Sequence, residues 1–201
     1  MRHSIGAVVL LAAAAAGIGA GASREQARAA AAASSGSPRA SSYESWLFKP
    51  TFTVRLPAGW TVAERDSDGA QLWHECKTCP QDGELKGELT LDMALGAMSP
   101  SKAIARLRKA ANVQAGSPRR AMLGTVSGFE FTANRTGTGD VVFQDSGYHT
   151  DAGGAPLEIF AVRAAGRTVT IFIDPGTSRG SAARAFTASA LALAKAIRFT
   201  G

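Results

Sequence analysis

Cysteine is scarce in this chain of 201 residues, in which only two occur. A chain of this length can bury a sizeable core, so it does not need the disulfide framework of small secreted domains. Long apolar runs are also missing after residue 22, because Arg184, Lys195 and Arg198 interrupt the nearest one, residues 182–199. A bilayer span takes about 20 consecutive apolar residues. We therefore expect a soluble mature chain with no stable membrane span.

A cluster of like charges is absent as well. The net charge is +6, but the basic residues are scattered from Arg24 to Arg198 and form no compact basic run. This scatter argues against a protein that binds nucleic acid. It fits a GC-rich coding genome, and it leaves open an attraction to anionic polymers or lipid head groups of the cell envelope.

The first 22 residues have the layout of a secretory signal peptide. Arg2 lies in a short positive stretch, residues 5–16 form an uninterrupted apolar run, and Ala20 and Ala22 form a small-x-small cleavage site. No cysteine lies directly after the run to carry a lipid anchor. We expect an extracytoplasmic protein, periplasmic or secreted, whose mature chain begins at or near Ser23.

The mature chain is expected to divide into a leader and one domain. Residues 23–42 consist mainly of Ala, Ser and Arg and hold no large apolar side chain. Such a segment cannot offset the entropy lost on ordering the chain. Aromatic residues appear from Tyr43 onward. We predict a signal peptide over 1–22, a flexible leader over 23–42 and a single globular domain over 43–201.

Alternating apolar residues predict that strands dominate the domain. The first strand carries Phe52, Val54 and Leu56, and Pro57-Ala58-Gly59 turns the chain into a strand that begins with Trp60. Residues 89–95 alternate Leu and Met with polar residues, which predicts a half-buried strand with one polar face. Further strands are expected over residues 70–74, 122–133, 141–148, 157–164 and 168–173.

Two amphipathic helices are predicted. Ser99-Pro100 supplies an N-cap and a first-turn proline, and the helix that follows should end near residues 112–116. A closing helix is expected over residues 181–197. Short turns between consecutive strands require an antiparallel sheet, and the two helices should cover it. We therefore predict an α+β fold, an antiparallel β-sheet covered by helices.

Two segments resemble the PsbP-like family. Residues 52–60 read Phe-Thr-Val-Arg-Leu-Pro-Ala-Gly-Trp, which is similar to the family's F-x-x-x-L-P-x-G-W opening. The strand at 166–170, followed by a helix and Ile197-Arg198-Phe199, resembles its ending. The resemblance implies an α/β/α sandwich and an accessory, assembly or binding role, as in the extrinsic photosystem II protein, a yeast Ran-binding import factor and small exported bacterial proteins. It implies no shared catalytic centre.

One short motif carries chemistry, His74-Glu75-Cys76-Lys77-Thr78-Cys79. Cysteines in an exported chain usually pair, so we expect a Cys76–Cys79 disulfide that rigidifies a loop. Two alternatives stay open. The C-x-x-C spacing is that of thiol–disulfide exchange, although no helix follows to lower the pKa of the first thiol. His74 and the two thiolates would also supply three ligands for Cu(I) or zinc, although a structural zinc site requires a fourth.

Basic side chains lie on the outer face of the first predicted helix, at Lys102, Arg106 and Lys109. They form either a solvated helix face or a docking surface for an anionic partner. No catalytic set of residues is visible elsewhere in the sequence.

The sequence thus favours an exported, non-catalytic binding or accessory protein of the bacterial cell envelope, monomeric and without a cofactor. Its partner would be an unidentified envelope protein, polymer or small ligand. The alternative is a small thiol–disulfide or metal-handling protein that uses Cys76 and Cys79.

Overall fold

A computed structural model of the chain describes residues 40–75, 85–137, 139–144, 146–150, 154–176 and 178–200. The expected signal peptide, most of the expected leader and both cysteines lie outside the described residues. No helix that the structure describes is long and apolar enough to cross a membrane. The elements are β1 (Ser41–Glu44), β2 (Thr51–Leu56), β3 (Trp60–Glu64), β4 (Gly69–Glu75), β5 (Leu85–Met93), α2 (Pro100–Leu107), β6 (Val113–Ala115), β7 (Arg119–Leu123), β8 (Val126–Arg135), β9 (Val141–Phe143), β10 (Tyr148–Thr150), β11 (Leu157–Ala164), β12 (Arg167–Asp174), α3 (Gly180–Ala196) and β13 (Arg198–Thr200).

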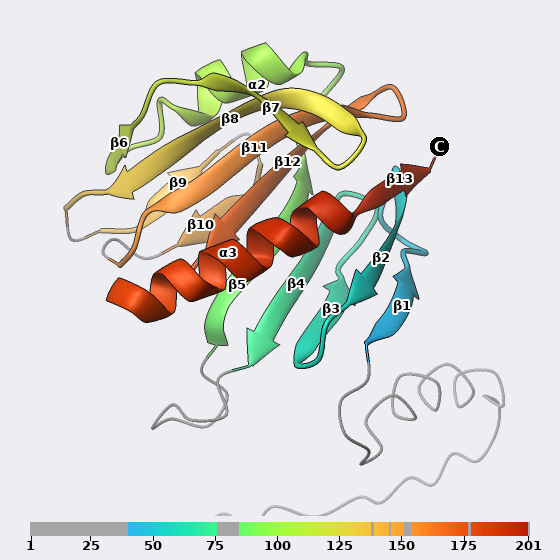
Figure 1. Ribbon diagram of the computed structural model, residues 1–201. Helices are drawn as coiled ribbons and strands as arrows, with labels where there is room; N and C mark the ends of the chain where they lie inside the picture. Colours follow the sequence, from blue (N-terminus) through green and yellow to red (C-terminus); the bar gives the residue numbers. More distant parts are fainter. Residues whose placement is uncertain are drawn as a thin grey trace, which may run out of the picture. The chain divides into compact units, whose positions relative to one another are not determined.

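An eight-stranded sheet forms the centre of the fold (Figure 1). Its order is β3-β4-β5-β12-β11-β8-β6, and β7 pairs with β8 beside β6. Every pairing in it is antiparallel, as the short turns predicted. β5 and β12 are neighbours although α2 and six strands separate them in the sequence. Pairing between distant segments therefore joins the two halves of the sheet.

The β11–β12 hairpin lies at the middle of the sheet. Its turn places Ala165 at φ 42° and Gly166 at φ 76°, and positive φ at both central residues is the geometry of a type I′ hairpin turn. Along β11, Ile159 and Ala161 point to one face, and Phe160 and Val162 point to the other. All four are buried because both faces of the sheet are covered.

One face of the sheet carries α2 and the β9–β10 hairpin. Ala103, Ile104 and Leu107 are the buried residues of α2, and their spacing places them on one face of the helix. They share a core cluster with the hairpin and with sheet residues, namely Val141, Phe143, Tyr148, Phe131, Ile159 and Phe172.

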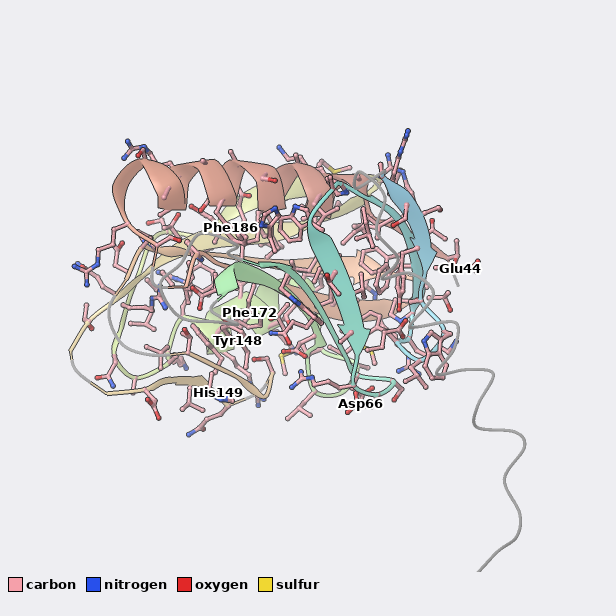
Figure 2. The ribbon with its side chains drawn as sticks, turned by 90° about the horizontal axis from the view of Figure 1, so that it is seen from below. Glu44, Asp66, Tyr148, His149, Phe172 and Phe186 are labelled. Carbon is pink, nitrogen blue, oxygen red and sulfur yellow. The ribbon has the colours of Figure 1, made fainter. Side chains whose placement is uncertain are left out.

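The opposite face carries α3 and a three-stranded sheet, β1-β2-β13. Phe186 and Leu193 of α3 share a core cluster with Phe52 and Val54 of β2. Figure 2 shows Phe186 on the α3 side, with Phe172 and Tyr148 on the other side of the sheet. The fold therefore has two cores, one on each face.

The predicted fold class, an α+β PsbP-like α/β/α sandwich with helices covering the sheet, is wrong. The described residues form a β-rich fold with thirteen strands and two helices. α2 has eight residues and is therefore only about 12 Å long, whereas the sheet is seven strands wide, and at a spacing of about 4.8 Å it spans roughly 29 Å between the edge strands. Strands have to cover what the helices leave open, and the β9–β10 hairpin and the three-stranded sheet do so.

The first helix also ends earlier than expected. Ser99 accepts a hydrogen bond from the Lys102 N–H at 3.5 Å, which confirms the predicted N-cap. The helix stops at Leu107 rather than near residues 112–116, because Asn112 has φ 60° and Val113 starts a strand paired with β8. Pairing with a distant strand therefore prevails over the helical pattern.

The polar face predicted for the strand at 89–95 is buried. Thr90 and Asp92 are 3% and 2% exposed, because they lie on the same face of β5 as Ala94, which belongs to the core cluster beneath α2 and the β9–β10 hairpin. Arg65 reaches the Asp92 carboxylate at 3.1 Å, and the Thr170 hydroxyl donates to the Asp92 carbonyl oxygen at 2.9 Å. Arg65 thus supplies a partner for the buried Asp92 carboxylate, whereas the Thr90 hydroxyl has no hydrogen-bond partner among the described residues.

Glu64, at the end of β3, fixes the connection between β1 and β2. Its carboxylate accepts hydrogen bonds from the backbone N–H groups of three successive residues, at 3.0, 2.7 and 2.6 Å, and from the Tyr43 hydroxyl. Burial raises the pKa of the Tyr43 phenol, and the hydrogen bond and charge of Glu64 raise it further. The residues whose N–H groups donate are Trp46, Leu47 and Phe48.

Candidate functional site: a groove beside α2

A groove lies between the end of α2 and β9, and we call it the α2 groove. Its volume is about 600 Å³, within the range of about 300–1,000 Å³ typical of ligand pockets. A neighbouring hollow of about 670 Å³ shares Gln144 with it and reaches the β11–β12 turn. The described residues that line the α2 groove are Arg106, Leu107, Lys109, Ala110, Ala111, Asp140, Val142, Phe143 and Gln144.

The floor of the α2 groove is rigidly packed. Phe143 lies with its ring centroid 5.1 Å from that of Phe172, and Tyr148 stacks on Phe172 at 4.4 Å. Aromatic pairs at these separations add about 0.5–1.5 kcal/mol each beyond the area that they bury. The β9–β10 hairpin is therefore attached to the sheet by its side chains.

A buried polar cluster holds the other end of the hairpin. The side chains of Arg135 and Asp174 are 2% and 3% exposed and form an ion pair at 3.3 Å. Asp174 also accepts hydrogen bonds from the hydroxyls of Tyr148 at 2.8 Å and Thr150 at 2.6 Å. The cluster thus links the ends of β8 and β12 to β10, and β10 pairs with β9, which lines the groove.

The three basic residues singled out in the sequence are all exposed on or just after α2. Arg106 and Lys109 line the α2 groove, whereas Lys102 does not. Asp140 is the single acidic side chain among the described residues of the lining. The groove therefore has a positive rim, which the spacing on the helix predicted in part.

His74 is the described member of the predicted cysteine motif. Its ring meets Trp60 edge-on with centroids 5.7 Å apart, and a Cβ at position 59 would come within 2.8 Å of its Nε2 atom. Gly59 has φ 83°, so both its backbone angle and the imidazole exclude a side chain there. Cys76 and Cys79 lie outside the described residues, so the disulfide, the redox role and the three-ligand metal site stay predictions. Among the side chains that the structure describes, no three potential metal ligands lie together.

A second hollow lies on the opposite face, between the start of α3 and strands β8 and β11, and we call it the α3 hollow. Its floor holds Glu158, whose pKa is raised mainly by burial and further by Glu130, while the Thr132 hydrogen bond and Arg119 lower it. Sequence reasoning missed this residue. The available signal was a lone acid near the start of the apolar strand Leu-Glu-Ile-Phe-Ala-Val.

The chain matches no protein-family model and no curated protein. The resemblance to the PsbP-like family stays a prediction.

Proposed function

We propose that this chain is an exported, non-catalytic binding protein of the bacterial cell envelope whose α2 groove receives an acidic partner. One observation carries the proposal. Arg106 and Lys109 line a groove of about 600 Å³ whose floor is fixed by buried aromatic rings. Export rests on the signal-peptide pattern of residues 1–22, and the non-catalytic role rests on the lack of a catalytic motif in the sequence.

The charge of the groove selects the sign of the partner. Exposed cations attract anions over about 10 Å at 0.1 M salt, and they raise association rates more than they raise affinity. Arg106 can pair with a carboxylate through two N–H groups, and Lys109 adds a point charge beside it. Leu107 and Phe143 offer apolar contact next to these charges.

The proposal is tested by reversing the charge of the groove. We expect Arg106→Glu with Lys109→Glu to weaken binding of a fluorescent polyglutamate peptide at least about tenfold, equivalent to about 1.4 kcal/mol. Fluorescence anisotropy at low and high salt measures the affinity, and the native chain should bind more weakly at high salt.

The control reverses two exposed cations outside the groove, with Arg55→Glu and Lys195→Glu, so that the net charge changes equally. We expect this variant to bind within about twofold of the native chain, because screened charges away from the contact contribute little. Equal losses in the two double variants would mean that overall charge attracts the peptide, and the proposal would be rejected.

A further inference from the structure

The α3 hollow is built from small residues on the helix and from two sheet strands. Its volume is about 580 Å³, large enough for a small organic molecule. Gly180, Ala183 and Ala188 leave the space open along α3, and Pro156 closes one side. The other described residues of the lining are Thr132, Gly154, Ala155, Glu158, Arg179, Arg184 and Thr187.

The floor presents one carboxylate. Glu158 and Thr132 are register partners on β11 and β8, and the Thr132 hydroxyl lies 3.2 and 3.1 Å from the two carboxylate oxygens. A single hydroxyl hydrogen cannot satisfy both oxygens of a half-buried carboxylate, which has about four acceptor sites. Burial raises the pKa of the Glu158 carboxyl. A ligand ammonium at this point would donate hydrogen bonds to the carboxylate and offset its negative charge.

The rim presents charges of the opposite sign. Arg179 and Arg184 line the hollow from the start of α3, and both are exposed. Their planar guanidinium groups match the geometry of a carboxylate. A simple anion would be repelled by Glu158 at the floor, and a simple cation would be repelled by the arginines at the rim.

The walls are held in place by the buried Arg135–Asp174 pair. The Arg135 guanidinium donates to the carbonyl oxygens of Ala155 at 2.8 Å and Gly176 at 3.2 Å, which fixes the wall segment and the turn that leads into α3. A Cβ at position 154 would lie 2.5 Å from that guanidinium, and Gly154 has φ 110°. The hollow is thus preorganised, which lowers the entropy cost of binding.

We propose that the α3 hollow binds a small zwitterion, with its ammonium group on Glu158 and its carboxylate on Arg179 and Arg184. The chemical class is that of free amino acids, both α-amino acids and longer ω-amino acids. This site is separate from the α2 groove and lies on the other face of the sheet.

The test uses the mature chain and a series of small probes. Glycine, 4-aminobutyrate and 6-aminohexanoate carry both charges at increasing separation, whereas butylamine and butyrate carry one charge each. NMR chemical shifts should saturate with at least one zwitterion, at least about tenfold more tightly than with either single-charge probe. The shift changes should fall on residues 154–158 and 180–188.

Variants separate recognition from folding. Glu158→Gln keeps the shape of the side chain and should weaken binding of the zwitterion at least about tenfold, equivalent to about 1.4 kcal/mol. We expect a loss of the same size in the double variant Arg179→Gln with Arg184→Gln. Glu44→Gln, an exposed acid on β1, is the matched control and should leave binding unchanged. Binding of the polyglutamate probe should survive Glu158→Gln, so that this proposal and the proposed function can fail independently.

Four outcomes would overturn the proposal. Lack of a saturable response to every zwitterion would exclude the site. Butylamine binding as tightly as the zwitterions would leave a cation site only, and butyrate binding as tightly would leave an anion site only. An unchanged affinity in Glu158→Gln would show that the carboxylate at the floor does not bind the ligand.

Discussion

Trp60 links three elements through its indole ring. It stacks on Phe186 of α3 with centroids 5.6 Å apart, and it meets His74 of β4 edge-on. It is 7% exposed and therefore belongs to the core. A residue at the start of an edge strand therefore joins that strand to the helix across the core.

Truncation of Trp60 should lower the free energy of unfolding by a large amount. We expect Trp60→Ala to cost about 3–5 kcal/mol of unfolding free energy, because it leaves a large cavity beside Phe186. Urea denaturation measures the loss. Trp46 is 67% exposed, so Trp46→Ala is the control and should cost under about 0.5 kcal/mol. A Trp60 loss as small as that of Trp46 would place the indole outside the core.

Glu158→Gln should change stability in a pH-dependent way. Because the folded-state pKa of Glu158 is raised, its contribution to stability is complete below the unfolded-state pKa and is lost as pH rises through the folded-state pKa. Glutamine cannot ionise. We therefore expect Glu158→Gln to be more stable than the native chain at about pH 7, with this advantage disappearing near about pH 3.5.

Thermal unfolding of the two proteins at both pH values measures this difference. An advantage for Glu158→Gln that is equal at the two pH values, or a loss at about pH 7, would show that the native carboxylate is not destabilised by burial. Stabilisation on removing a polar group is the behaviour expected of a residue kept for binding rather than for folding.

At the scale of elements, the β9–β10 hairpin depends on the groups around it. Each of its strands has three residues, too few for a hairpin to be stable alone. The aromatic floor and the Arg135–Asp174 cluster supply the missing stability. The sequence pattern predicted a single strand over 141–148, whereas the structure has two short paired strands, β9 and β10. Arg135 and Asp174 are far apart in the chain, so no local pattern could predict their pairing.

Removal of Arg135 should loosen the hairpin. Arg135→Met keeps the apolar stem but leaves the buried Asp174 carboxylate without its cation, so we expect a loss of about 3–5 kcal/mol. Guanidinium chloride would screen charges, so urea denaturation is the measurement. Arg119→Met removes a 72% exposed partner of Glu130 and should cost under about 1 kcal/mol. Equal losses in the two variants would contradict the structural role given to the buried pair.

Local signals predicted most elements, and long-range contacts decided where they end. The strand over 157–164 and the closing helix follow from the periodicity of apolar residues. The predicted strand over 122–133 is instead parts of two strands, since Gly124, with φ 60°, sits in a tight turn between β7 and β8. A single glycine within a run of alternating residues is too weak a signal to predict that the chain turns back there.

For the whole molecule, the sequence predicted an antiparallel sheet but not its coverage. β1, β2 and β13 form one small sheet from opposite ends of the described chain, and neither end carries a signal for the other. The apolar faces of a sheet must be covered, which led to the prediction of helices on them. The three-stranded sheet and the β9–β10 hairpin instead cover much of these faces. The basic residues of the α2 groove could be predicted from the pattern of one helix. The groove itself could not, because it forms only where the β9–β10 hairpin lies beside that helix.

The most direct test of the central claim is an NMR titration of the ¹⁵N-labelled mature chain with the polyglutamate peptide. Binding in the α2 groove predicts saturable shift changes concentrated at residues 106–111 and 140–144. Changes that are spread evenly over the basic surface, that centre on α3, or that fail to saturate would contradict it.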